Sequence, residues 1–456
     1  MNSSQELGTE KIGKLLQKMA IPASAGILVM SVYFIVDTIF VGRFVGSLGI
    51  AAITVVMPIT FFFSSMGMAI GVGGASIISR ALGADDYSKA CRTFGNMITL
   101  AFLLIVCLVS IGFFFQEALL MAFGAKGDIL GPAKTYFSII LLGVPGLGWS
   151  MMSNNVMRAE GEPKMAMLTM MIPAVVNLIL DPIFIVWLDM GLTGAALATT
   201  ISYYMSALFT LWFFLSGRSE LEVFWSSLKL QSNLVWEIFS IGGVTLARQG
   251  SVSLLSIVLN NSLFIYGNEI AVSIYGIISR IVMFVNFPVL GITQGFLPIA
   301  GYNYGAQKWE RVRAIIRTSI RSGTFIALFL FTGIMLFAKQ LVGLFTTDPE
   351  LLSRTPSALR TAFLATPLIT VQLIGSAYFQ AIGKALPALL LTMTKQGFFL
   401  IPLVLILPLF YGLDGIWYAF PLSDVLAASV TYWYLRREVD NKLGKSPVAD
   451  IARVET

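Results

Sequence analysis

The stretch PAVVNLILDPIFIVWLD at residues 173–189 places an asparagine and an aspartate inside an otherwise apolar run. Asn177 and Asp181 are four residues apart, so both side chains lie on one face if the run is a helix. A carboxylate within hydrocarbon costs roughly 2.5 to 3.5 kcal/mol on insertion scales, so such a group is usually paired or functional. Asp181 is therefore a candidate functional residue in a membrane-spanning helix.

The composition around this stretch is that of a membrane protein. Of the 456 residues, 57% are hydrophobic and 12% are charged, against roughly 45 to 50% and about 25% in soluble domains. Apolar runs of about 20 residues, long enough to cross a bilayer, recur along the whole chain. We expect an all-α polytopic protein with twelve transmembrane helices, near 15–41, 50–78, 93–115, 132–153, 164–187, 191–215, 236–264, 269–300, 314–338, 356–379, 385–410 and 413–435.

The loops predict the orientation, because cytoplasmic loops carry an excess of Lys and Arg. If both termini lie on one side, most of the 30 Lys and Arg residues fall on that side. Both termini are therefore expected in the cytoplasm. Orientation and lipid contact account for the net charge of +6, so we predict no nucleic-acid partner.

An internal repeat relates the two halves. Gly73 is matched by Gly295, and Gly191 by Gly412, at a nearly constant offset along the chain. Six spans return the chain to its starting side, so the halves form two parallel six-helix bundles, an architecture of transporters. The predicted domains are an N-terminal bundle carrying a cation site, a cytoplasmic linker, a C-terminal bundle and a cytoplasmic tail, at 1–215, 216–233, 234–438 and 439–456.

Further oxygen-bearing side chains are expected at the membrane depth of Asn177 and Asp181. Asp37 and Tyr33 share a face of the first helix, and the others are Tyr136 and Thr199. Carboxylate, amide and hydroxyl oxygens suit a proton or a hard cation such as Na⁺. The alternative is that the acids only tether helices through hydrogen bonds.

The second half does not repeat these acids. At the same offset, the positions that correspond to Asn177 and Asp181 are Phe399 and Leu403. This half instead carries four charged residues within its spans, for which structural and substrate-binding roles are both open: Arg248, Arg280, Lys395 and Asp424. Lys395 and Asp424 lie at similar depths on consecutive helices, so an ion pair is expected. Pro22 removes a hydrogen bond from the first helix and is read either as a bending point or as a fixed kink.

Four segments together resemble the multidrug and toxic compound extrusion (MATE) family, particularly its bacterial MepA-like members. They are VDTIFVGRFVG at 36–46, GVGGASIISRALGADDYSKA at 71–90, NLILDPIFI at 177–185 and VGLFTTD at 342–348. The resemblance implies a V-shaped pair of bundles that exports cationic, amphiphilic drugs by alternating access against an H⁺ or Na⁺ gradient. It also implies a cation site formed by Asp37, Asn177, Asp181 and Thr199, with Pro22, Tyr33 and Tyr136 at associated positions. Where some members carry acids in the C-terminal lobe, this chain has Asn260, Asn261, Gln372 and Ser376.

We therefore expect a secondary active multidrug antiporter, with H⁺ or Na⁺ as coupling ion and no other cofactor. The alternative is a lipid-linked precursor flippase of the same superfamily, which would use Arg248, Arg280 and Lys395 in a cationic cleft. No HExxH, nucleophile elbow or GxxxxGK[ST] motif occurs, so neither an enzyme nor an ATPase is indicated. The expected protein is a monomer in the bacterial inner membrane, in contact with lipid and small-molecule drugs and without an ATPase subunit.

Overall fold

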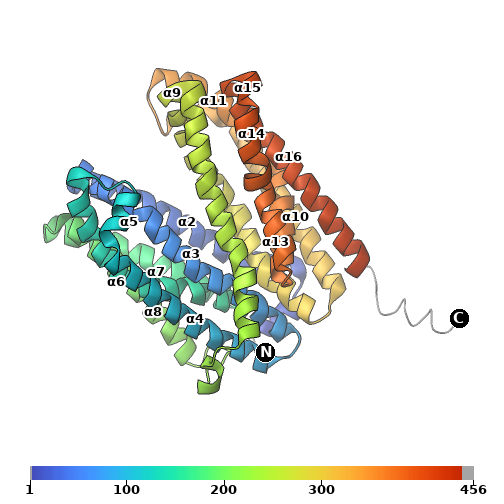
Figure 1. Ribbon diagram of the computed structural model, residues 1–456. Helices are drawn as coiled ribbons and strands as arrows, with labels where there is room; N and C mark the ends of the chain where they lie inside the picture. Colours follow the sequence, from blue (N-terminus) through green and yellow to red (C-terminus); the bar gives the residue numbers. More distant parts are fainter. Residues whose placement is uncertain (1–2, 444–456) are drawn as a thin grey trace, which may run out of the picture. The chain divides into compact units, whose positions relative to one another are not determined.

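The computed structural model describes residues 3–443, and every regular element in that range is a helix (Figure 1). The described chain folds into two compact units. Unit 1 contains residues 3–7 and 25–245, and unit 2 contains residues 8–24 and 246–443. The end of the predicted cytoplasmic tail, from residue 444 onward, lies outside the described range.

The all-α membrane fold predicted from the sequence is confirmed. Ten helices in the described range are long and apolar enough to cross a membrane. One of them, α9 (Ser232–Gly305), contains two of the predicted spans, and α16 (Leu413–Glu438) occupies the last one. Each of the twelve predicted apolar runs is thus mainly helical, although two of them are interrupted by turns.

Unit 1 is built around α6 (Leu130–Ala159). This helix packs against α3, α4, α7 and α8, so 61% of its span is buried, against 22% for α4. The other helices of unit 1 are α3 (Ser47–Gly83), α4 (Tyr87–Phe114), the short α5 (Gln116–Ala122), α7 (Pro163–Asp181), α8 (Gly191–Leu215) and the part of α2 (Ile12–Phe44) from residue 25 onward. A helix covered on several sides can carry polar groups that lipid would not tolerate.

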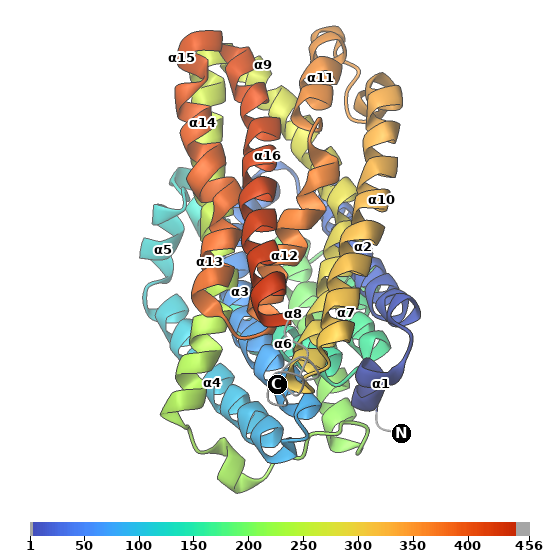
Figure 2. The ribbon, with the colours of Figure 1, turned by 90° about the vertical axis from the view of Figure 1, so that its right-hand side faces the viewer.

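Unit 2 is built in a related way around α12 (Ile369–Ala381) and α16 (Figure 2). Its third long helix is α10 (Trp309–Gly343). The predicted span at 356–379 is divided into α11 (Pro349–Ala362), a tight turn at Thr366–Leu368 and α12. The span at 385–410 consists of α13 (Ala385–Met393), a wide turn at Thr394–Leu400, α14 (Ile401–Ile406) and α15 (Pro408–Tyr411).

Two helices pass from one unit to the other within their length. Helix α2 changes unit between Ser24 and Ala25, and α9 changes unit between Thr245 and Leu246. At the offset of 222 that relates Gly73 to Gly295, Ala25 corresponds to Ala247, one residue after Leu246, so the two changes of unit fall at nearly matching positions of the repeat. Helix α9 is interrupted at Asn268, where a φ of 59° and a ψ of −164° bend the chain without a loop. Residues other than glycine rarely adopt this backbone conformation.

The segment after α8 is fixed to unit 1 by the buried side chain of Asn96 on α4. Its amide nitrogen donates to the carbonyls of Ser227 (3.1 Å) and Lys229 (3.2 Å), and its oxygen accepts from the Gln231 amide (2.7 Å). Gly95 leaves the space for this contact, because a Cβ there would lie 2.4 Å from the Ser227 carbonyl oxygen. The predicted linker is therefore packed as part of unit 1, with one short helical turn, η3 (Trp225–Leu228).

Candidate functional site

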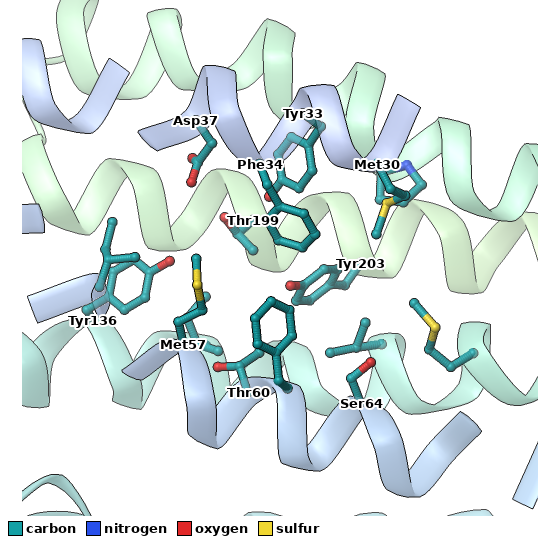
Figure 3. A pocket seen from close by; sticks show the side chains of 16 residues that line it. Met30, Tyr33, Phe34, Asp37, Met57, Thr60, Ser64, Tyr136, Thr199 and Tyr203 are labelled. Atoms are coloured by element: carbon teal, nitrogen blue, oxygen red, sulfur yellow. The ribbon is translucent and has the colours of Figure 1, made fainter. Parts of the chain in front are cut away.

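A cavity of about 140 Å³, partly open at the surface, lies within unit 1 between α2, α3, α6, α7 and α8 (Figure 3). Its wall is mostly apolar and contains thioethers and aromatic rings from Met30, Met57, Met151, Phe34 and Phe61. The polar side chains facing it are Asp37, Thr60, Ser64, Thr199 and the three tyrosines Tyr33, Tyr136 and Tyr203. A largely apolar cavity with a few convergent polar groups is typical of a small-molecule site.

The two predicted acids meet at one end of this cavity. Asp37, 7% exposed, projects from α2 into the cavity, and Asp181, 2% exposed, ends α7 behind it. Their side chains lie close enough to interact directly. Because a carboxylate only accepts hydrogen bonds, a hydrogen bond between the two acids would require a proton on one of them. Buried carboxyl groups so close together are suited to taking up and releasing one positive charge.

Asn177 and Thr199 complete the polar group around Asp181. The Asn177 amide nitrogen donates to the Thr199 hydroxyl (3.2 Å), which in turn donates to the Ala195 carbonyl (3.0 Å). The amide of Asn177 also hydrogen-bonds to Asp181. Two buried oxygens have no partner among the described residues, Asn177 Oδ1 and Asp181 Oδ1.

These unpartnered oxygens fit a small cation. Buried acceptors without a donor are costly, and a proton or a bound Na⁺ would satisfy them. The ligands for Na⁺ would be oxygens of Asp37, Asn177, Asp181 and Thr199. No group of three or more His, Cys, Asp or Glu that could bind a metal occurs in residues 3–443, so the donor set suits a monovalent ion better than a transition metal.

The chain also leaves its helical path at Asp181. Helix α7 ends there and continues as a wide turn of the π type over Pro182–Trp187. Turns of this type inside helices are frequent at functional sites. Such a turn places Asp181 at the end of one helical segment, where its carboxyl group can reach Asp37 on α2.

The structure brings Tyr33 and Tyr136 to the same cavity and adds a residue that the sequence analysis missed. Tyr136 hydrogen-bonds to Thr199. Tyr203 on α8 lies four residues after Thr199 and also faces the cavity. The four-residue spacing on one helix face could have indicated it. The roles of the predicted residues stay predictions, because geometry alone does not test them.

The charged residues predicted in the second half do not form one group. Lys395 Nζ lies 2.6 Å from Asp424 Oδ1 as a largely buried ion pair. Arg248 is half-buried and Arg280 is exposed, and neither forms an ion pair within the described residues. Pro22 lies in uninterrupted helix, two residues before the point where α2 changes unit.

The chain is similar to known proteins over most of its length. The family model described as MatE matches residues 22–183 and again residues 245–406. The multidrug export protein MepA of Staphylococcus aureus (strain MSSA476) is 30% identical over 417 residues, 91% of each chain. MepA of Staphylococcus saprophyticus is 28% identical over the same share.

Two solved structures are similar over nearly their full length. One is an outward-facing multidrug resistance MATE family transporter of the MOP superfamily, with 27% identity, a TM-score of 0.91 and coverage of 97% of this chain and 98% of the other. The second is a MOP superfamily transporter from Pyrococcus furiosus, with 27% identity, a TM-score of 0.90 and the same coverage. A reversed polarity of the binding pocket suggested a different function for that second protein.

Proposed function

Since this chain belongs to the MATE family of membrane transporters, which are not enzymes, we propose that it exports lipophilic, often cationic drugs by antiport with H⁺ or Na⁺. The family match confirms the MATE resemblance predicted from the sequence, and multidrug export proteins of the MepA type are relatives of this chain. Coupling and antiport are our proposal. The observation that supports it is the position of Asp37, which faces the cavity and also contacts Asp181.

The carboxyl group of Asp37 could bind either of two ligands, the drug or the coupling ion. A cationic drug in the cavity is stabilised by an ionised Asp37 and by the surrounding aromatic faces and thioethers. A proton shared with Asp181, or a Na⁺ bound between them, neutralises the same carboxylate. The drug and the coupling ion therefore compete, and each favours release of the other.

The membrane potential can drive the exchange of an inward-moving ion for a neutral drug, whereas the one-for-one exchange for a monocationic drug moves no net charge and is driven by the concentration gradient of the ion. One elementary charge moving inward supplies about 2.3 kcal/mol per 100 mV, enough for roughly a 50-fold gradient of a neutral solute. Binding and loss of the ion would shift the equilibrium between two conformations of the transporter. Helix α2 carries Asp37 and changes unit near Pro22, so it could transmit that shift from the ion site. The protein would act as a monomer in the bacterial inner membrane, with both termini cytoplasmic.

The alternative, a lipid-linked precursor flippase, has weaker support. It requires free cationic groups, and Lys395 is neutralised by Asp424. Of the three cations assigned to it, Arg248 and Arg280 remain without an acid among the described residues. The residues that line the cavity of unit 1, by contrast, include a carboxylate and three phenols and no cationic side chain.

Drug uptake into everted vesicles tests the proposal, because their lumen corresponds to the outside of the cell. Asp37→Asn and Asp181→Asn should each reduce gradient-driven export at least tenfold, because the pair can then no longer exchange a charge. Asp189→Asn is the matched control, since Asp189 is exposed and its φ of 50° is accepted by Asn. Undiminished export by both site variants would exclude this mechanism. Drug-stimulated ion flux in proteoliposomes, under separate pH and Na⁺ gradients, then identifies the coupling ion.

A further inference from the structure

The side chain of Tyr203 places a hydroxyl group in the cavity of unit 1, across from Asp37. In Figure 3 its ring projects from α8 between Thr199 and the wall formed by α3, with the oxygen toward the interior. Tyr203 also interacts electrostatically with Asp37. None of the roles assigned above to the cavity residues uses this hydroxyl.

The position of Tyr203 is fixed by close packing of α8 on α6. A Cβ at Gly143 would lie 3.2 Å from the Tyr203 ring, and a Cβ at Gly146 would lie 3.0 Å from the Tyr203 carbonyl carbon. The two glycines thus let α8 approach α6 so closely that the backbone at Tyr203 cannot shift toward α6. The phenol is therefore held toward the cavity.

The hydroxyl of Tyr203, like that of Tyr33, has no hydrogen-bond partner among the described residues, in contrast to the hydroxyls of Tyr136 and Tyr204. Tyr136 is bonded to Thr199. Tyr204, the next residue, is exposed on another face of α8 and donates to the Leu142 carbonyl at 2.7 Å. Tyr203 is thus an immobilised donor available to a ligand.

We propose that Tyr203 is a specificity residue that donates a hydrogen bond to an acceptor group of the substrate while Asp37 binds its cationic centre. The preferred substrates are then aromatic monocations that carry a carbonyl, ester or ether oxygen. Purely hydrocarbon cations fill the same cavity without this bond. The inference rests on the proposed function, because it assumes that drugs bind in this cavity.

Two cations of equal length distinguish the contributions of charge and hydrogen bond. Benzoylcholine and phenylbutyltrimethylammonium have the same ring and ammonium group and differ by an ester. Their affinities are measured by equilibrium binding to the full chain in nanodiscs. A neutral hydrogen bond is worth about 1 kcal/mol, so Tyr203→Phe should lower the affinity ratio of ester to hydrocarbon about fivefold. Tyr204→Phe, which removes the phenol outside the cavity, should keep the wild-type ratio.

Several outcomes would overturn the role of Tyr203. A wild-type ratio in Tyr203→Phe excludes the hydrogen bond, and so does an equal loss of both ligands, which shows damage to the cavity. Asp37→Asn separates this role from the proposed function, since it should weaken both cations alike. If Asp37→Asn has that effect and Tyr203→Phe leaves the affinity ratio of ester to hydrocarbon unchanged, the cavity is supported as the drug site and the proposed role of Tyr203 is wrong.

Discussion

Glu160, the residue that follows α6, is buried, and we expect its carboxyl group to make the stability of unit 1 depend on pH. Its carboxyl group is 1% exposed and accepts from the Ser219 hydroxyl (2.5 Å) and the Leu221 amide (3.1 Å). Burial raises its pKa from 4.5 to about 8, and the two hydrogen bonds only partly offset this, while Glu220 and Glu162 nearby add to the rise. The other oxygen, Oε2, is buried without a partner among the described residues.

The sign of the effect follows from proton binding. Between pH 4.5 and about 8 the folded protein holds a proton on Glu160 that the unfolded chain has lost, so the free energy of unfolding falls as pH rises. The stabilisation is complete below the unfolded pKa and is lost above the folded one. At 1.36 kcal/mol per unit, the loss between pH 6 and pH 8 is roughly 2 kcal/mol.

The assay compares thermal unfolding midpoints of the purified protein at pH 6 and pH 8. Glu160→Gln keeps both acceptor bonds without a charge, so its midpoint should fall less with pH than that of the wild type. Glu117→Gln is the control, because Glu117 is an exposed partner of Lys134. If Glu160→Gln and the wild type lose the same number of degrees, the buried carboxyl group is not the cause.

Two further predictions concern packing in each unit. Asn96→Ala removes three hydrogen bonds to the segment at 227–231 and should lower the free energy of unfolding by roughly 3 kcal/mol. The expected result is a lower thermal unfolding midpoint and faster proteolysis of the segment after α8. An unchanged rate of cleavage would show that other contacts hold the segment in place. Lys395→Met leaves Asp424 buried and unpaired and should cost roughly 3 to 5 kcal/mol. Adding Asp424→Asn should restore most of that loss in a thermal denaturation assay, and a double variant no better than the single one would argue against the pair.

The helices were predictable because lipid leaves the backbone no other way to satisfy its hydrogen bonds. The places where these helices are interrupted were harder to predict. The apolar run at 164–187 reads as one helix, yet the backbone widens directly after Asp181. The run at 356–379 likewise gives no sign of the break before α12, apart from Pro367. Hydropathy shows which residues prefer lipid. It does not show where the backbone changes from an α-helix to a wider or tighter turn.

The candidate site shows the same limit at the level of single side chains. The spacing of Asn177 and Asp181 predicts a shared face, and the structure places both beside Thr199. Two adjacent tyrosines follow on α8, and the sequence does not say which of them faces inward. The choice is made by packing against Gly143 and Gly146, which belong to a different helix and lie much earlier in the chain.

The internal repeat explains why the second unit has an ion pair instead of an ion site. The positions of the first half that correspond to Asp424 and Lys395 are Tyr203 and Pro173, and both line the cavity of unit 1. The same place in the two related bundles is therefore a cavity wall in one and a neutralised pair in the other. A buried pair without net charge has little to gain from binding or losing a proton, whereas the proposed mechanism assigns the exchange of one positive charge to Asp37 and Asp181. Under the proposed mechanism the exchangeable charge is therefore confined to unit 1, and that mechanism predicts one coupling ion per cycle.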